Sequence, residues 1–164
     1  MPLLNWIGKE KIVNHDKDVP FRLLRKNKKY SLGKSENLIL EGDNLEALKA
    51  LMPFYYGKIK CIYIDPPYNT GNEKWVYNDK VNSPKIKEWL GKAVGPEGDD
   101  LTRHDKWLCM MYPRLKLLKE LLSDDGVIFI SIDENELNNL IFILDEIFDN
   151  NKIGIFTWVR KKKG

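Results

Sequence analysis

Two kinds of hydrophobic pattern divide this chain. Continuous apolar runs at 59–64 and 126–132 predict strands, and apolar stretches at 37–41 and 153–159 predict two more. The run at 59–64 contains a single charged residue, which is typical of a strand buried on both faces. Because strands alternate with helical patterns, we predict an α/β fold with a mostly parallel sheet and helices on both faces.

Helical stripes fill the intervals between these runs. A helix over about 44–52 should begin at Asp43, since Asp43 and Glu46 have the spacing of a capping box, and should end at Pro53. A last helix should follow the similar capping pattern at 133–136. Its apolar residues form one buried stripe, made of Leu137, Leu140, Ile141, Leu144, Ile147 and Phe148.

The longest helical pattern covers about 102–123, with Asp105 near its N-terminus and Pro113 inside it. A proline within a helix removes one hydrogen bond, so we expect a kink or a break there. The two cysteines, Cys61 and Cys109, lie in apolar surroundings, and neither spacing suits a metal site or a redox pair. We therefore expect both to be buried, reduced thiols, and we assign no metal ligands.

Length and composition indicate how the chain is organised. With 164 residues and 43% hydrophobic side chains, it suffices for one folded domain. The mixed, polar residues 1–35 should wrap, as an N-terminal extension, around a domain formed by residues 36–164. Residues 69–101 are rich in glycine and tryptophan, with a weak helical signal near 83–92. A connection of this length inside a domain is typical of an active-site lid.

Charge and hydropathy restrict the partners. The net charge of +3 permits nucleic-acid binding without requiring it. No stretch approaches the ~20 apolar residues that span a bilayer, and the N-terminus lacks the apolar core of a signal peptide. We therefore expect a cytoplasmic protein without membrane contact. Two basic clusters either contact phosphate or are solvated; they comprise Arg22, Arg25, Lys26, Lys28, Lys29 and Lys34, and then Arg160, Lys161, Lys162 and Lys163.

The most informative polar sequence is Asp65-Pro66-Pro67-Tyr68, directly after the apolar run at 59–64. In open α/β sheets, ligands bind beyond the carboxyl ends of the strands. The two prolines hold the backbone in one shape and leave carbonyl oxygens as acceptors. The Asp65 carboxylate and the Pro66 oxygen would accept the two hydrogens of an exocyclic amine, beside the Tyr68 ring. An ordinary strand-ending turn is the alternative.

The sequence Asp-Pro-Pro-Tyr-Asn-Thr-Gly at 65–71 resembles the amine-methylating motif of adenine-specific (N6) DNA methyltransferases. The resemblance is greatest to the modification subunits of type III restriction-modification systems, and it covers nearly the whole chain. It also includes the segments 5–9, 38–45, 104–111 with 114–115, and 125–134. An ordered set of segments is far more specific than the four-residue motif, which has relatives that modify other amines.

This resemblance implies a partial Rossmann-like, S-adenosylmethionine-dependent methyltransferase fold. It implies that Asp65, Pro66, Pro67 and Tyr68 are catalytic, and that Asp43 and Asp65 bind S-adenosylmethionine. The implied partners are DNA, whose target adenine is flipped out of the duplex, a restriction subunit and a second copy of the chain. Helix capping explains Asp43 equally well, and the two roles are compatible.

Several neighbouring residues have plainer roles. His104, in the first turn of a helix, should be structural, and Trp107, Met110 and Met111 should belong to the core. The acidic residues at 133–134 would line the strand-end crevice or cap a helix.

The resembled family also carries a Phe-x-Gly-x-Gly loop for the methionine part of the cofactor, and this sequence has none. We therefore expect the N-terminal half of a longer methyltransferase, with the strand at 37–41 apart from the strand at 59–64. Two alternatives remain open. Cytosine-N4 methylation acts on a similar exocyclic amine, and a catalytically incomplete fragment would bind nucleic acid or assemble without methylating it.

Overall fold

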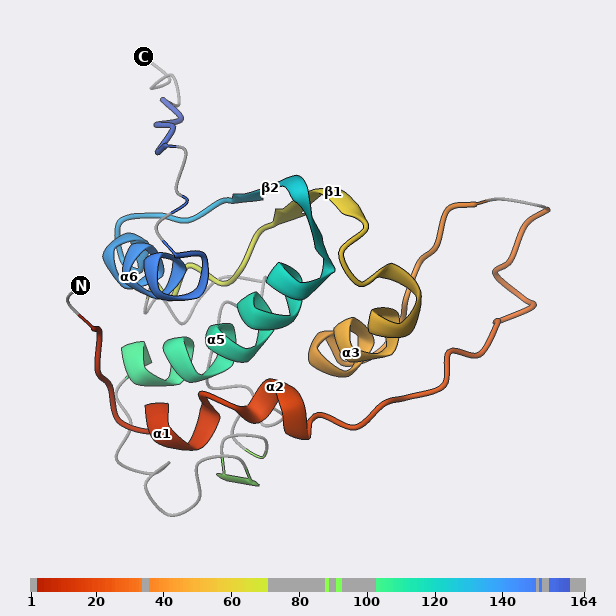
Figure 1. The fold of residues 1–164 in the computed structure, drawn as a ribbon, viewed down its shortest axis with the longest axis horizontal. Helices are drawn as coiled ribbons and strands as arrows, with labels where there is room; N and C mark the ends of the chain where they lie inside the picture. Colours follow the sequence, from red (N-terminus) through yellow and green to blue (C-terminus); the bar gives the residue numbers. More distant parts are fainter. Residues whose placement is uncertain are drawn as a thin grey trace.

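Two parallel strands and the helices around them form the part of the chain that the computed structural model describes, which comprises residues 3–33, 36–70, 88, 91–92, 103–149, 151 and 154–159. In Figure 1, α5 lies at the centre, with the strands along one side and α1 and α2 along the other. The elements are α1 (Lys9–Ile12), α2 (His15–Asp18), α3 (Asn44–Tyr55), β1 (Ile59–Ile64), α5 (Arg103–Leu121), β2 (Leu122–Ile130) and α6 (Leu137–Ile147).

The sheet confirms the predicted parallel arrangement. Ile62 of β1 pairs with Ile128 of β2, and the register shifts between Ile59 and Cys61. At this irregularity the backbones approach closely, because a Cβ atom on Gly126 would lie 2.7 Å from the Ile59 carbonyl oxygen. Since the strands are parallel, both carboxyl ends lie at one edge of the sheet.

One face of this sheet packs on the core and the other is open. Ile62 is buried, whereas Cys61, Tyr63 and Phe129 are exposed on the opposite face. The prediction that the strand at 59–64 is buried on both faces is therefore wrong, as is the prediction of a buried Cys61. The physical reason is that the described helices pack against a single face, so alternate side chains of β1 meet solvent.

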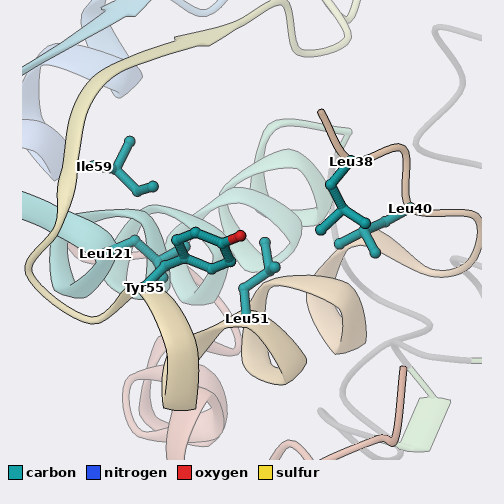
Figure 2. Close-up of a pocket in the computed structure, with 6 residues that line it drawn as sticks. All are labelled: Leu38, Leu40, Leu51, Tyr55, Ile59 and Leu121. Carbon is teal, nitrogen blue, oxygen red and sulfur yellow. The ribbon is translucent and has the colours of Figure 1, made fainter. Parts of the chain in front are cut away.

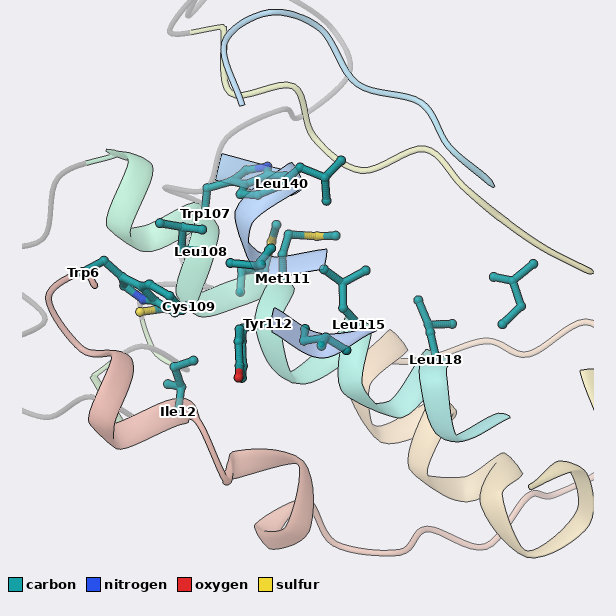
Figure 3. Packing of buried hydrophobic residues seen from close by; sticks show 14 residues of the cluster. Trp6, Ile12, Trp107, Leu108, Cys109, Met111, Tyr112, Leu115, Leu118 and Leu140 are labelled. Carbon is teal, nitrogen blue, oxygen red and sulfur yellow. The ribbon is translucent and has the colours of Figure 1, made fainter. Parts of the chain in front are cut away.

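Helix α5 supplies most of the core, as Figure 3 shows. It runs as one element through Pro113, so the proline does not split it. Its buried side chains contact Trp6 and Ile12 from the N-terminal segment, Ile62 from β1, and residues of α6. Trp107 and Cys109 are fully buried, which confirms the prediction for both.

The N-terminus of α3 confirms the predicted cap. The Asp43 carboxylate accepts from the backbone nitrogens of Leu45, at 2.9 Å, and Glu46, at 3.2 Å. The reciprocal half of the capping box does not form, because the Glu46 carboxylate instead accepts from Arg22. The cap therefore satisfies two backbone donors at the start of the helix.

At its other end, α3 continues past Pro53 to Tyr55, so the predicted stop at Pro53 is wrong. A proline there removes only one hydrogen bond, and the Tyr56 nitrogen still donates to the Met52 oxygen at 3.1 Å. Met52 and Leu45 are buried against α5, and this packing holds the last turn in place.

The apolar stripe of α6 differs from the prediction, because only two of the six predicted residues are buried and the other four are half-buried. Leu140, Ile143 and Ile147 are the buried residues, and Ile143 was absent from the predicted stripe. The predicted cap at 133–136 forms a turn instead, in which Asp133 accepts from the Asn135 nitrogen at 3.0 Å. Glu136 is the N-cap residue by position, without a capping hydrogen bond from its side chain.

The predicted strand at 37–41 is wrong, although the side chains alternate as a strand's would. Leu38 and Leu40 line an apolar hollow of about 210 Å³, whereas Ile39 is 94% exposed. Figure 2 shows the hollow, whose other lining residues are Leu51, Tyr55, Ile59 and Leu121. The segment has no paired strand beside it among the described residues, and without ladder hydrogen bonds alternation alone does not make a strand.

The last predicted strand, at 153–159, is also wrong over residues 154–159. Residues 154–159 form no strand, and all six are exposed. Residue 153 and most of the predicted lid at 69–101 lie outside the described residues, although 88, 91 and 92 are helical. Within the described part of the chain, no helix is both long and apolar enough to span a membrane.

Candidate functional site

The sequence Asp65-Pro66-Pro67-Tyr68 lies at the carboxyl edge of the sheet, where β1 ends. Asp65 is exposed, Pro66 is buried, and Pro67 and Tyr68 are half-buried. The carboxylate therefore faces outward while the prolines anchor its backbone. This is the edge at which ligands bind in open α/β folds.

Trp107 fixes the second proline. Its indole nitrogen donates to the Pro67 carbonyl oxygen at 2.6 Å, and the ring itself is fully buried in the core. The Pro67 oxygen is thus occupied. Pro66, whose oxygen was predicted to accept the other amine hydrogen, is buried just before it.

Asn69 ends the motif in an unusual backbone conformation. Its φ of 57° lies in the left-handed region, which asparagine tolerates better than most residues. The Arg103 guanidinium donates to the Asn69 carbonyl oxygen at 3.0 Å, and the Asn69 amide donates to the Arg103 carbonyl oxygen at 3.2 Å. These two bonds tie the motif to the first residue of α5.

A buried carboxylate, Glu136, lies behind this connection and is fully buried. It accepts hydrogen bonds from the side-chain amides of Asn69 and Asn139, the latter at 2.8 Å, and from His104 Nδ1 at 2.7 Å. The Arg103 Nε atom donates to His104 Nε2 at 3.3 Å, so the imidazole proton lies on Nδ1 and points at Glu136. A buried carboxylate is tolerated only when its oxygens are bonded in this way.

Tyr68 acts on Asp65 directly. The pKa of Tyr68 is raised above its usual value, first by burial, then by the hydrogen bond to Asp65 and by the Asp65 charge, with smaller effects from Tyr63 and Asp133. A raised pKa keeps the phenol protonated beside the Asp65 carboxylate. A carboxylate has two oxygens, so Asp65 also keeps acceptor positions for other donors.

Residues after β2 complete the edge. Ser131 Oγ lies 2.8 Å from the Tyr63 hydroxyl and joins the ends of the two strands. Both Asp133 oxygens accept from Asn135, its backbone nitrogen and its side-chain amide. Asp133 therefore organises the turn, and Glu134 beside it is exposed.

Asp43, the other predicted cofactor residue, caps α3 and keeps a 59% exposed side chain. Its second oxygen lies 4.0 Å from the guanidinium of Arg114 in α5, whose Nε atom donates to the Asn44 side chain at 2.7 Å. Burial lowers the pKa of Arg114, and Asp43 opposes this shift. The structure gives no direct contact between Asp43 and Asp65.

Helix α5 nevertheless connects the two aspartates. Trp107, which holds Pro67, and Arg114, which faces Asp43, are seven residues apart in α5. Seven residues make nearly two turns, so both side chains leave the same side of the helix about 10 Å apart along its axis. One rigid element thus positions both predicted groups.

Sequence patterns missed Asn69, Arg103 and Glu136 as parts of this site. Asn69 carried a signal, because an asparagine between tyrosine and Thr70-Gly71 is typical of a turn. No sequence signal marked Glu136 as part of the site, since an acidic residue before a helix is usually interpreted as a helix cap. The apolar hollow of Figure 2 is a separate feature, because Ile59 lies at the opposite end of β1 from Asp65.

Comparison with known proteins adds a family match. Residues 59–164 match the model of a family described as DNA methylase. This range includes β1, the motif at 65–68, α5, β2 and α6.

Curated relatives match over most of the chain. It is 39% identical, over 94% of its length, to the Mod subunit of the type III restriction-modification enzyme EcoP15I from Escherichia coli. It is 41% identical over 88% of its length to the EcoPI Mod subunit of Escherichia phage P1, and 36% identical over 81% to the type II methyltransferase M.KpnI of Klebsiella pneumoniae. These matches cover 26%, 24% and 29% of the relatives, so the chain spans about a quarter of their length.

Proposed function

Because this chain belongs to the DNA methylase family, we propose that it carries the amine-binding part of an enzyme that methylates the N6 atom of adenine in DNA. The observation that carries the proposal is Asp65, an exposed carboxylate at the carboxyl edge of a parallel sheet, in a backbone held by buried anchors. Similarity to Mod subunits supports a place in a restriction-modification system, with a restriction subunit as partner. A second copy of the chain is a further partner that we propose from the family resemblance alone.

The chemistry follows from the amine. The lone pair of the adenine N6 atom is delocalised into the ring, so the amine is a poor nucleophile. Acceptance of its two hydrogens by Asp65 and the Pro66 oxygen would favour a tetrahedral nitrogen with a localised lone pair. As the nitrogen gains positive charge, the carboxylate stabilises the transition state more than the ground state.

Tyr68 would bind the base. A target inside a duplex is out of reach, so the nucleotide must leave the stack at a cost of a few kcal/mol. Stacking on an aromatic ring returns roughly 1–3 kcal/mol per base. The half-buried Tyr68 ring adjoins Asp65 through its hydroxyl, so a stacked base would lie beside the carboxylate.

S-adenosylmethionine is the methyl donor that the family implies, and when bound it would supply an electrophilic methyl group. Asp43 fits such a cofactor, because its side chain is 59% exposed and one carboxylate oxygen is not used by the helix cap. An oxygen of this kind accepts hydrogen bonds from hydroxyl or amino groups. Asp65 has the same free acceptor capacity beyond its bond to Tyr68.

Cytosine N4 is the second candidate target, since the same two acceptors suit its amine. A chain that spans about a quarter of its relatives also leaves a third candidate, a nucleic-acid-binding part that does not methylate by itself. Aspartate at the first motif position favours adenine, as the resemblance implies.

The test is transfer of tritiated methyl groups to DNA, followed by separation of the labelled bases. We expect label in N6-methyladenine, and Asp65→Ala should lower the rate by about 10²–10³, the usual cost of losing one preorganised group. Asp124→Ala, which removes an exposed carboxylate in β2, is the matched control. Activity that survives Asp65→Ala would remove this mechanism. Label in N4-methylcytosine would favour the second candidate, and no label with the unaltered chain the third.

A further inference from the structure

The segment between α2 and α3 contains the longest run of exposed residues in the described chain. Residues 20–33, here called the basic arm, contain no helix or strand, and all fourteen are exposed. Figure 1 shows the chain leaving α2 and running away from the core before it returns to α3. A segment this open contributes no buried side chain to the core.

The charge of the basic arm differs from that of the rest of the molecule. It carries five cations and no acidic residue, namely Arg22, Arg25, Lys26, Lys28 and Lys29. The whole chain has a net charge of +3, so the residues outside the arm together carry −2. Apart from the basic cluster at 160–163, the excess positive charge of the molecule is therefore concentrated in the arm.

The tip of the basic arm has a defined turn. The Asn27 carbonyl oxygen accepts from the Tyr30 nitrogen at 3.2 Å and from the Ser31 hydroxyl at 2.8 Å, and the Asn27 side chain accepts from the Lys29 nitrogen at 3.2 Å. This turn lies between the pair Arg25-Lys26 and the pair Lys28-Lys29. It brings like charges together at one place, which costs free energy unless anions are near.

Acidic side chains of the same chain neutralise only part of this positive charge. Arg22 forms an ion pair with Glu46 at 2.9 Å, which fastens the base of the arm to α3. Among the described residues, the other four cations have no ion pair with an acid. Lys29 lies 5.2 Å from the Tyr30 ring centre, and Tyr30 is itself 70% exposed.

We propose that the basic arm binds the phosphate backbone of DNA. This rests on the proposed function, which places a duplex against the molecule. A polyanion relieves the repulsion at the tip, and each neutralised phosphate releases counterions. The exposed side chains of Leu23 and Tyr30 each adjoin a cation in the sequence and would contact groove walls or an unstacked base. Since phosphates carry no sequence information, the arm would set affinity and register, not the target sequence.

The experiment measures binding of the chain to a labelled duplex of about 30 base pairs by fluorescence anisotropy, between about 50 and 200 mM salt. The variant replaces Arg25, Lys26, Lys28 and Lys29 with alanine. We expect binding at least about tenfold weaker at low salt, and a slope of log K against log salt that is smaller by about 3–4.

A matched control replaces four exposed lysines outside the arm, Lys11, Lys17, Lys58 and Lys92, with alanine and should keep most of the slope. The variant with Lys26→Arg, Lys28→Arg and Lys29→Arg keeps the charge and should bind like the unaltered chain. An equal loss in the arm variant and the lysine control, an unchanged slope in the arm variant, or no binding by the unaltered chain would each overturn the proposal. So would loss of self-association without loss of DNA binding, because a second copy would then be the occupant.

Separate outcomes would refute the proposed methyl transfer and the proposed binding of DNA by the basic arm. Asp65→Ala should slow methyl transfer by the factor given above and retain the salt dependence of binding, because Asp65 adds no positive charge. If the unaltered chain binds DNA through the arm and transfers no methyl group, the proposed function fails and the basic arm stands. If methyl transfer requires Asp65 and the arm variant keeps its affinity, the basic arm fails and the function stands.

Discussion

At the scale of single residues, the site joins one exposed functional group to several buried ones that hold it. Asp65 faces solvent, while Trp107 and Glu136 are fully buried. Trp107 holds the backbone before Tyr68, and Glu136 holds Asn69 after it. A carboxylate that must accept an amine hydrogen in a fixed direction gains from such anchors, because a loop fixed in advance does not have to be ordered during the reaction.

Because three side chains donate hydrogen bonds to Glu136, we expect its carboxylate to contribute to the stability of the fold. Glu136→Gln keeps the shape, but its amide nitrogen must face one of three donors, from Asn69, His104 or Asn139. We expect the free energy of unfolding to fall by about 1–3 kcal/mol, because a buried group is left unsatisfied. Urea denaturation followed by tryptophan fluorescence measures it.

Glu134→Gln is the control, since Glu134 is exposed two residues away. Equal stabilities of the two variants would mean that the hydrogen bonds of Glu136 do not stabilise the fold.

At the scale of elements, β1 and β2 approach each other so closely at Gly126 that no side chain would fit there. The register shift between Ile59 and Cys61 brings Gly126 against the Ile59 backbone. The same pairing carries the motif, because Asp65 follows β1 directly. The close contact of Gly126 with Ile59 at the start of β1 therefore affects where Asp65 lies at its end.

Gly126→Ala should weaken this pairing. The new Cβ atom would lie 2.7 Å from the Ile59 oxygen and 2.8 Å from the Leu122 side chain, so the backbone must move. Overpacking of this kind typically costs about 1–3 kcal/mol. Thermal unfolding by circular dichroism should show a lower midpoint. Gly154→Ala, where nothing lies within 4 Å, should leave the midpoint nearly unchanged. A loss as large for Gly154→Ala would refute the steric explanation.

At the scale of the whole molecule, ionisable side chains link the N-terminal segment to the distant helices. Lys9 of α1 forms an ion pair with Glu146 of α6 at 2.7 Å, and Glu146 also accepts from the Tyr112 hydroxyl of α5 at 2.8 Å. Trp6 lies under the Lys9 ammonium, 4.8 Å away, and against the Tyr112 ring. Three helices thus meet at one half-buried carboxylate, and Trp6 and Lys9 are buried beside it.

Stability should fall in alkaline solution. Burial, and then Glu146, raises the pKa of Tyr112 above its usual 10.0, and burial raises the pKa of Cys109 from 9.0 to about 11. Both groups stay neutral in the folded chain after they ionise in the unfolded one. Their contributions are complete below pH 9 and are lost as the pH rises through the folded-state values.

Urea denaturation under reducing conditions at about pH 8, 9.5 and 10.5 should show this loss, which reaches about 1.4 kcal/mol per pH unit for each group that ionises only when unfolded. Tyr112→Phe should flatten the profile above its usual pKa of 10.0, whatever it does to stability at neutral pH. A profile that stays flat to pH 10.5 in the unaltered chain would contradict the assignment.

Patterns in the sequence located β1 at its observed bounds, the helix cap at Asp43 and the motif at 65–68. Such features depend on neighbours within a few residues, so local propensity and periodicity predict them. The strand predictions at 37–41 and 153–159 failed for a related reason. Alternation of side chains is local, whereas a strand also needs a partner backbone, which no local pattern supplies.

The sequence by itself determined that an aspartate, two prolines and a tyrosine follow an apolar strand, and that cations gather between residues 20 and 33. The tertiary structure alone decided that Glu136 bonds Asn69, 67 residues away, and that Trp107 bonds Pro67, 40 residues away. It also decided that one face of β1 is open. Contacts at such separations depend on how elements pack, and packing free energy is shared among many side chains, so no short segment encodes them.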